Sequence, residues 1–292
     1  MKTAKIVIGN SASITPELIE KYGFIVVPFT IDWPERETLE GNNIFEQMRN
    51  AEKKGITTTP KTSQPSMGLF KKAFDQGLTE AEAIVCITIS SGISGTYNSA
   101  IQARKMFGED IQKRIFIIDT FNADVSESLL ALKAAEMSEK GIKAEEIVKS
   151  IEESLPHTFL YGMLESPKWL EAGGRISHAV AIILTQMQKI GMRPILTMKD
   201  GQVKPANLKM QAQDTANALF KQFEDTAKKA LQEGKKCRVG ISHADNLEEA
   251  QKLRSLIESK YPQIKIDFIS TTGVVIGAHV GPGTLICCSL EK

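Results

Sequence analysis

The sequence lacks the features that mark membrane, secreted and nucleic-acid-binding proteins. No apolar run approaches the roughly 20 residues of a membrane span. The opening stretch, MKTAKIVIGNSASITPE, turns polar after Ile8, so it does not resemble a secretory signal. Lysine and arginine number 36 against 35 aspartates and glutamates, and the two signs are interspersed rather than gathered on a basic face. We therefore expect a cytoplasmic protein with no transmembrane segment and no nucleic-acid partner.

Cysteine is also scarce. The chain has four, namely Cys86, Cys237, Cys287 and Cys288, and no CxxC motif. Three of them lie inside apolar, strand-like runs, and Cys237 begins another. Adjacent cysteines rarely reach one metal ion or pair with each other. We predict reduced thiols in the core, no metal site and no cofactor.

The first half of the 292-residue chain alternates between strand-like and helical patterns. Apolar runs occur at KIVIG, FIVVPF, AIVCITI and RIFIID, and helical patterns with Ser, Thr or Asn caps lie between them. Strands that alternate with helices predict an α/β fold with a parallel sheet. In such a sheet the ligand crevice lies beyond the carboxyl ends of the strands.

The second half follows a different pattern. A charged helical segment over 137–158 is interrupted by Pro156, and we place a domain boundary there, between 1–155 and 156–292. Asp200-Gly201 then separates two strand-like runs, which is a strong signal for a β-hairpin. The runs CRVGISHA, IKIDFIS and TLICCSL follow, with helical patterns around the first. This half is predicted to be an α+β domain with a mixed or antiparallel sheet.

Residues 87–100, ITISSGISGTYNSA, place a turn rich in hydroxyls after a strand end. Two interpretations compete: Ser94 is a catalytic nucleophile, or the turn holds an anion by hydrogen bonds alone. The nucleophile elbow requires G-x-S-x-G, whereas Thr96 stands where the second glycine belongs. A helix that starts near Gly95 would direct free N–H groups and its positive dipole end toward Ser94, which suits a carboxylate or phosphate.

Two further turns carry polar side chains. In TTTPKTSQPSMG, Pro60 and Pro65 restrict the backbone on either side of Thr62 and Ser63. In GAHVGPGT, the glycines permit close backbone approach and His279 projects from a constrained turn. Each turn, taken alone, is compatible with a purely structural loop.

Arg175 lies in EAGGRIS, just before a predicted helix. An arginine at a helix start is unfavourable with the helix dipole unless an anion lies nearby, although a surface ion pair would also explain it. The helix itself carries an apolar stripe from Ile176 to Ile190 at three- and four-residue spacing. Such a stripe is typical of core packing, and the alternative is a ligand tunnel.

Taken in order, KTSQPS, SSGISGTY, FIIDT, EAGGRIS and GAHVGPGT resemble the DegV family of bacterial fatty-acid-binding proteins along essentially the whole chain. The resemblance implies an N-terminal α/β domain, a C-terminal α+β domain, and a long-chain fatty acid such as palmitate buried between and within them. It implies that the carboxylate is held by Thr62 and Ser94. It also implies a supporting head-group site of Ser63, Gly95, Arg175 and His279. Some members pass the bound acid to a separate ATP-dependent fatty acid kinase.

The chain departs from the family pattern at several positions. The family usually has DSxxD after its first strand, where this chain has NSAS beginning at Asn10. A usual Ser and two glycines after IIDT are replaced by Asp124, Ser126 and Ser128. The basic cluster that commonly follows the hairpin keeps one lysine in LKMQAQ, next to Met210. We expect these positions near the pocket mouth or on surfaces that a kinase contacts, so they bear on the kinase partnership.

Elementary energetics agree with a carrier. A sixteen-carbon chain buried at about 0.8 kcal/mol per methylene supplies roughly 10 kcal/mol of gross driving force. The buried carboxylate then needs hydrogen bonds, which hydroxyls and helix N–H groups provide without a base beside a nucleophile. We predict a non-enzymatic fatty-acid carrier. The alternative is a serine hydrolase that acts on an acyl ester through Ser94 and His279.

Overall fold

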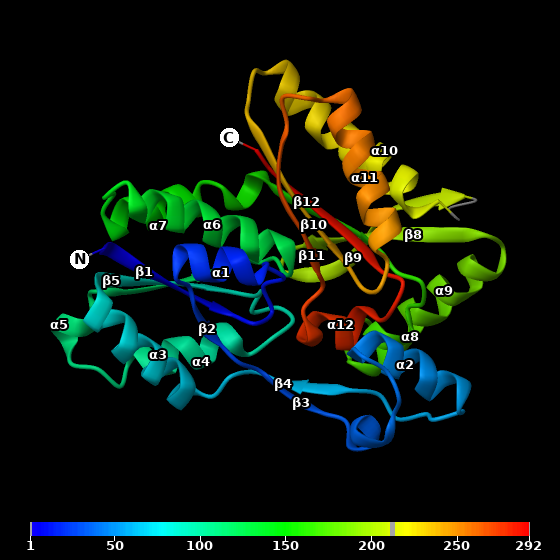
Figure 1. The fold of residues 1–292 in the computed structure, drawn as a ribbon, viewed down its shortest axis with the longest axis horizontal. Coiled ribbons are helices and arrows are strands. Elements are labelled where there is room, and N and C mark those ends of the chain that lie inside the picture. The colour runs from blue at the N-terminus through cyan, green and yellow to red at the C-terminus, as the bar shows by residue number, and fades with distance from the viewer. Residues whose placement is uncertain (1, 211–213, 292) are drawn as a thin grey trace.

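A computed structural model describes residues 2–210 and 214–291 and contains two main sheets (Figure 1). The first sheet has four parallel strands, in the order β2 (Ile25–Val27), β1 (Lys2–Gly9), β5 (Ala81–Thr88) and β6 (Ile115–Asp119). The predicted parallel α/β sheet is therefore confirmed. All four strands end at the same edge, which is where the polar turns begin.

Helices cover both faces of this sheet. One face carries α3 (Met67–Glu80) and α4 (Thr96–Arg104); the other carries α6 (Val125–Glu139) and α7 (Ala144–Glu152). The shorter α1 (Pro16–Tyr22) and α5 (Glu109–Gln112) complete this part. Helix α3 begins where the Ser66 side chain accepts a hydrogen bond from the Leu69 N–H, and it buries Phe70 and Phe74 on one stripe.

The second sheet has six strands, in the order β11 (Lys265–Thr271), β10 (Cys237–His243), β12 (Leu285–Glu291), β7 (Thr158–Met163), β8 (Met192–Lys199) and β9 (Gln202–Met210). Only β10 and β11 are parallel, so the sheet is mixed, as predicted. Asp200 and Gly201, both with positive φ, make the predicted hairpin turn between β8 and β9. Helices α10 (Thr215–Gln232) and α11 (Leu247–Lys260) pack on this sheet.

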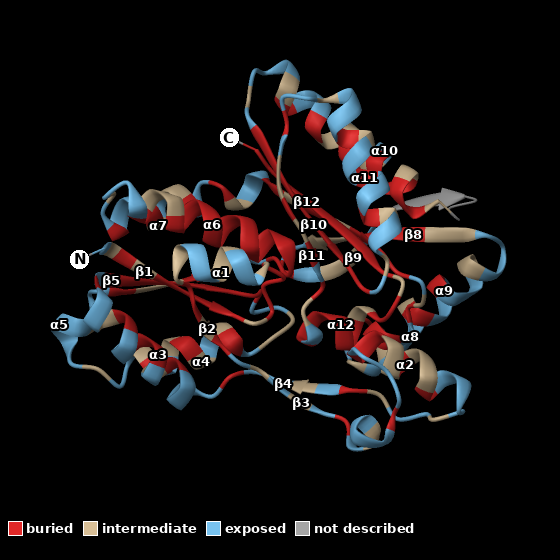
Figure 2. Cartoon of the chain, viewed as in Figure 1, coloured by how far each residue is buried: buried red, intermediate tan, exposed pale blue. Residues whose placement is uncertain are grey.

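Helix α6 lies between the two sheets, and the sequence analysis did not predict it. Side chains of β10 alternate: Val239 and Ile241 join the core under α10 and α11, whereas Gly240 and Ser242 meet Leu129 and Asp124 of the α6 region. Twelve of the 15 residues of α6 are buried, and Figure 2 shows this helix red along most of its length. A helix buried on all sides has no polar face, so it gives no amphipathic pattern.

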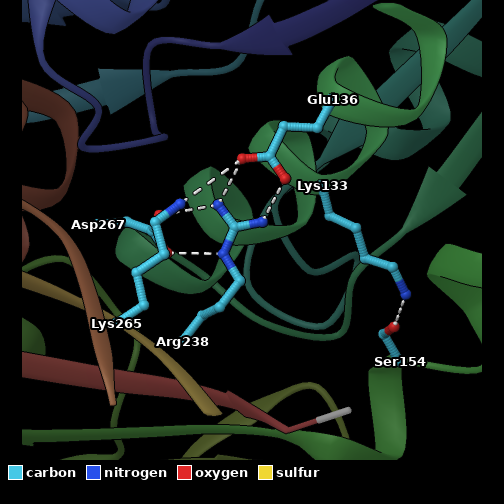
Figure 3. A network of polar contacts seen from close by, with 6 residues as sticks. All are labelled: Lys133, Glu136, Ser154, Arg238, Lys265 and Asp267. Atoms are coloured by element: carbon cyan, nitrogen blue, oxygen red, sulfur yellow. Dashed lines mark hydrogen bonds and ion pairs between the residues drawn. The ribbon is translucent and has the colours of Figure 1, made fainter. Parts of the chain in front are cut away.

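An ion network ties α6 to the second sheet (Figure 3). The Arg238 guanidinium on β10 makes two hydrogen bonds to Glu136 of α6, at 2.7 and 2.9 Å. It makes two more to Asp267 of β11, at 2.7 and 2.9 Å, and Lys265 pairs with the same carboxylate at 2.6 Å. Because Arg238 and Asp267 are buried, removing one partner would leave an uncompensated charge, which typically costs about 3–5 kcal/mol.

Residues 30–63 leave the first sheet and pack on the second half of the chain. They contain β3 (Thr30–Asp32), η1 (Pro34–Thr38), α2 (Ile44–Lys53) and β4 (Lys61–Ser63). Phe45 and Met48 share a core cluster with Trp169 and Ala278. Helix α2 therefore does not cover the parallel sheet, although its place between strand-like runs suggested that it would.

The elements η2 (Leu155–His157), α8 (Lys168–Ala172), α9 (His178–Lys189) and α12 (Val274–Val280) complete the described structure. Both α6 and residues 30–63 belong to the first half and contact the second. The division at residues 155 and 156 stays a prediction. Within residues 2–210 and 214–291, no helix is long and apolar enough to cross a membrane.

Candidate functional site

A cavity of about 760 Å³, including its open part, lies beyond the carboxyl ends of the parallel strands. Its wall comes from the turns after β5 and β6, from the inner face of β7, β8 and β12, and from α8 and α12. Most lining side chains are apolar. The polar ones are Thr62, Ser94, Asp124, Arg175, Thr197 and His279. Its mix of many apolar and few polar groups is typical of a small-molecule pocket.

Thr62 and His279 are 217 residues apart in the chain and hydrogen-bonded in the structure. Thr62 lies on β4, and its Oγ1 is 2.8 Å from Nε2 of His279. His279 was expected on a constrained turn, but it occupies the last turn of α12, and Gly281 with φ +77° ends that helix. The helix fixes the ring more firmly than a loop would.

The His279 ring is neutral. Burial, and next the positive charge of Arg175, lower the pKa of His279 to about 4. Its Nδ1 is buried and has no hydrogen-bond partner among the described residues. An orphaned N–H would cost more than an orphaned lone pair, so the proton belongs on Nε2, which then donates to the Thr62 oxygen. The Thr62 O–H is left free to donate into the cavity.

Gly173 makes room for this ring. A Cβ atom at position 173 would lie 2.1 Å from Nδ1 of His279, closer than any real contact. The same glycine accepts a hydrogen bond at its carbonyl from Nη1 of Arg175. The GGR sequence thus positions both the imidazole and the guanidinium.

Ser94 lies in the turn between β5 and α4. Its Oγ is 2.8 Å from Oγ1 of the buried Thr96, and it also accepts a weak bond from the Thr96 N–H at 3.4 Å. Helix α4 begins at Thr96 with Gly95 as its N-cap, so its positive end faces the region of Ser94, as expected. Within the described residues Ser94 pairs with Thr96 and His279 pairs with Thr62, so the two do not form a nucleophile–base pair.

Arg175 lies where the cavity meets a more open surface depression that also includes Ile93 and Val203. Its guanidinium is half-buried, which lowers its pKa somewhat, but arginine remains charged. Its hydrogen bond to the Gly173 carbonyl leaves the positive charge without an acidic partner among the described residues. A cation in this state favours an anion at the cavity mouth.

Ser63 and Gly95 do not line the cavity. Successive side chains on β4 alternate, so Ser63 is exposed when Thr62 faces inward, and we leave Ser63 out of the site. Gly95 contributes through its lack of a side chain, because a Cβ there would lie 2.8 Å from Nε2 of Gln64. The absence of a side chain lets the Thr62 and Ser94 turns approach each other.

The sequence analysis missed the role of Asp119. This residue ends β6, and its carboxylate accepts hydrogen bonds from the backbone N–H groups of Ser91 (3.2 Å) and Phe121 (2.9 Å). It thereby fixes the Ser94 turn against the next strand end. An acidic residue at the end of a strand, as in FIIDT, is the signal that could have indicated this.

The departures from the family pattern lie mostly inside the molecule. Asp124 lines the cavity, in keeping with a position near the pocket. Ser126 and Ser128 are fully buried on α6 and therefore do not lie on a surface that a partner could contact. Asn10 is partly exposed and accepts a bond from the Phe29 N–H at 2.9 Å. Met210 ends β9, and the following positions 211–213 lie outside the described residues.

Two sheets enclosing an apolar cavity with a few polar groups define an α/β ligand-binding protein. The family described as "uncharacterised protein, DegV family" matches residues 3–292, and the chain belongs to the DegV family. It is 30% identical to a "fatty acid-binding protein" of Thermotoga maritima, over 96% of this chain and 95% of that one.

Solved structures agree. The chain is similar to a crystal structure described as DegV, a fatty acid binding protein from Bacillus subtilis, with 28% identity, a TM-score of 0.82 and full coverage of both chains. A DegV family protein from Thermus thermophilus, described by its fatty acid binding, shares the fold at 24% identity and the same TM-score, again over both full chains.

Proposed function

We propose that this protein binds one long-chain fatty acid, such as palmitate, with its acyl chain in the cavity and its carboxylate held by Thr62 and Ser94. The observation that carries the proposal is the cavity itself, which is apolar over most of its wall. The rest of the wall has hydroxyls, a neutral imidazole, the buried Asp124 carboxyl and a guanidinium that has no acidic partner among the described residues. A long-chain fatty acid has the matching division into an apolar chain and an anionic head.

Relatives support this proposal. The Thermotoga maritima protein and the Bacillus subtilis structure, at 30% and 28% identity over nearly the whole chain, are both described as fatty-acid-binding proteins. Burial of the acyl chain supplies the affinity, at about 0.8 kcal/mol per methylene. Hydrogen bonds to the carboxylate offset the cost of its desolvation, and they place the carboxylate end of the fatty acid at the polar part of the wall.

In this proposal each head-group residue has a role in binding. His279 donates from Nε2 to Thr62, so the Thr62 hydroxyl presents its proton to the carboxylate. Ser94 provides a second hydroxyl beside the positive end of α4. Arg175 supplies the counter-charge at the mouth, and Gly95 allows the two turns to meet. None of these roles requires a covalent bond to be made or broken, so the function that we propose is that of a carrier and not of an enzyme.

Mass spectrometry of the lipid extracted from freshly purified protein tests the proposal. We expect one fatty acid per chain, and delipidated protein should rebind palmitate. If no acyl chain is recovered and palmitate does not bind, the proposal fails.

The alternative is a hydrolase that acts through Ser94 and His279. It would require His279 to accept the Ser94 proton, whereas the imidazole contacts Thr62. Labelling with a fluorophosphonate probe separates the two functions, because only an activated serine reacts. We expect no label on Ser94.

Transfer of the bound acid to a separate fatty acid kinase is a further proposal, which rests on the family resemblance. Arg175 and the depression around it form an accessible mouth through which a carboxylate could be presented. Mixing loaded protein with the kinase subunit of a DegV-containing bacterium and ATP should give acyl phosphate. Free palmitate without this protein serves as the control.

A further inference from the structure

Asp124 is the one acidic residue among those that line the cavity in the described part of the chain. Asp124 is 1% exposed and stands at the N-terminal end of α6, between the two sheets. Thr197 also lines the cavity, but its hydroxyl already donates a hydrogen bond to the Leu160 carbonyl at 2.7 Å. Asp124 is therefore the acidic group that a bound acyl chain would meet.

The carboxyl of Asp124 is held by groups from different parts of the chain. Ser13, in the turn after β1, donates to Oδ1, and Ser242, on β10, donates to Oδ2. Ser13 is itself fixed by the Gly273 N–H at 2.8 Å, and Ser242 accepts a bond from Thr272 at 3.2 Å. This arrangement fixes the orientation of both carboxyl oxygens.

The carboxyl keeps hydrogen-bonding capacity for a ligand. A carboxylate accepts about four hydrogen bonds. Besides the two serine hydroxyls, the Val125 N–H lowers the pKa of Asp124, while burial, the largest influence, raises it to about 6. With three donors identified, one of the about four acceptor positions of an ionised carboxyl has no donor among the described residues.

Other charged groups near Asp124 are few. Glu127, the next acidic residue along α6, is fully buried, accepts bonds from Ser11 at 2.9 and 3.2 Å, and lies outside the cavity lining. Burial, and further the charge of Asp124, raise the pKa of Glu127 well above its ordinary value, which favours the neutral form of Glu127.

We propose that Asp124 makes the cavity selective for a fatty acid that carries a hydroxyl group on its chain. A methylene chain laid against a buried carboxylate offers it no donor, whereas a hydroxyl donates directly to the free position. Sites built to hydrogen-bond a ligand hydroxyl discriminate strongly against analogues that lack it, because the buried polar group is then left incompletely paired. The inference rests on the proposed fatty-acid binding and refines its ligand class.

Binding measurements on delipidated wild-type protein test the inference. The probes are palmitate and saturated sixteen-carbon acids with one hydroxyl near the carboxyl end, at mid-chain or at the terminal carbon. We expect at least one hydroxylated acid to bind about tenfold or more tightly than palmitate. Equal or weaker binding of every hydroxylated acid overturns the inference and leaves the proposed function standing. Binding of no acid at all overturns both.

Variants identify the residue responsible. In Asp124→Ser, the ratio of affinities for the preferred hydroxylated acid and palmitate should fall to about one. Glu127→Gln is the matched control, since it alters a neighbouring buried carboxyl outside the cavity, and it should keep the wild-type ratio. If Asp124→Ser does not fold, Asp124→Asn keeps the shape, and the ratio should drop severalfold. A wild-type ratio in either folded Asp124 variant overturns the assignment.

Discussion

Two clusters of hydroxyls in this protein differ in the groups to which they donate hydrogen bonds. We call them the head-group cluster, which contains Thr62, Ser94 and Thr96, and the internal cluster, which contains Ser11, Ser13 and Ser242. The internal cluster donates to Asp124 and Glu127, carboxyls of the chain itself. The head-group cluster has no carboxyl of its own among the described residues, and its hydroxyls contact each other or His279.

The difference shows why counting hydroxyls does not identify a binding site. A hydroxyl that donates to a buried carboxyl of the protein is occupied, and its role is structural. A hydroxyl that meets only neutral partners, beside a helix N-terminus and an unpaired arginine, keeps a donor for an anion from outside. The internal cluster contacts carboxyl groups of the protein, and the head-group cluster does not. Adding a carboxyl to the head-group cluster, or removing one from the internal cluster, therefore tests the comparison.

Supplying the head-group cluster with its own carboxyl should have the largest effect. We expect Ser94→Asp to weaken palmitate binding by at least about a hundredfold, because like charges in contact cost several kcal/mol. Ser91→Asp is the matched control, since Ser91 lies exposed in the same turn and does not line the cavity. Isothermal titration should find near wild-type affinity for the control. Similar losses in both variants would mean that overall charge, and not this cluster, governs binding.

Removing the charge from the internal cluster should change the pH dependence of stability. The pKa of Asp124 is about 6 in the folded protein and 3.8 ordinarily. Between pH 3.8 and about 6, the folded state therefore binds more protons at this residue than the unfolded state does. The free energy of unfolding therefore falls as pH rises from about 4 to about 6, by roughly 3 kcal/mol from this group. In Asp124→Asn, this fall in the free energy of unfolding should be absent.

Denaturant unfolding of both delipidated proteins at pH 4 and pH 7 measures the difference. His279 titrates with the opposite sign, since its folded pKa of about 4 makes stability rise with pH in nearly the same window. It is present in both proteins and cancels in the comparison. Parallel pH profiles would contradict a raised pKa for Asp124.

Deleting single hydroxyls from the head-group cluster should have an intermediate effect. Thr62→Val and Ser94→Ala should each weaken palmitate binding by roughly 1.5–3 kcal/mol, the value of a hydrogen bond to a charged group. The double variant should lose less than the total of the two, because both hydroxyls serve one carboxylate. Unfolding curves check that each variant remains folded. Unchanged affinity in both single variants would place the head group elsewhere.

Changes at His279 should have the smallest effect when the donor is kept. Because the imidazole is neutral, His279→Gln should bind palmitate within about threefold of wild type, whereas His279→Leu should bind clearly more weakly. In Asp124→Asn, which lacks the other group that titrates in the cavity near pH 6, palmitate affinity should also stay level as the pH rises from about 6 to about 9. A fall in affinity over that range would show that a charged imidazole takes part.

Much of the fold follows from local sequence patterns. The parallel strands, the Asp200-Gly201 hairpin and the mixed second sheet were predictable because each depends on a short apolar run or a turn with a known requirement. The residues Thr62, Ser94, Arg175 and His279 were named from turns and helix starts, and all four line one cavity.

Features set by long-range packing were not predictable. Helix α6 lacks a polar face because a sheet covers it on each side, and α2 lies over the second half because Phe45 and Met48 pack there. The outward direction of Ser63 depends on the register of β4, which a three-residue strand does not reveal in sequence. The family resemblance placed Asp124 near the pocket mouth or a kinase surface, but its hydrogen-bond partners Ser13 and Ser242 could not be predicted, since they lie more than 100 residues away.

The position of β12 has a consequence for how the protein is made. This strand follows every other strand of its sheet in the chain, yet it lies between β10 and β7. On a ribosome, the strands on its two sides would emerge first and remain unjoined, and α6 would be left with one face uncovered. The cavity wall would likewise stay open at Ile286 until β12 is made. Such long-range pairing is slow and exposes apolar surface, so we expect chains in which β12 has not yet paired to be prone to aggregation.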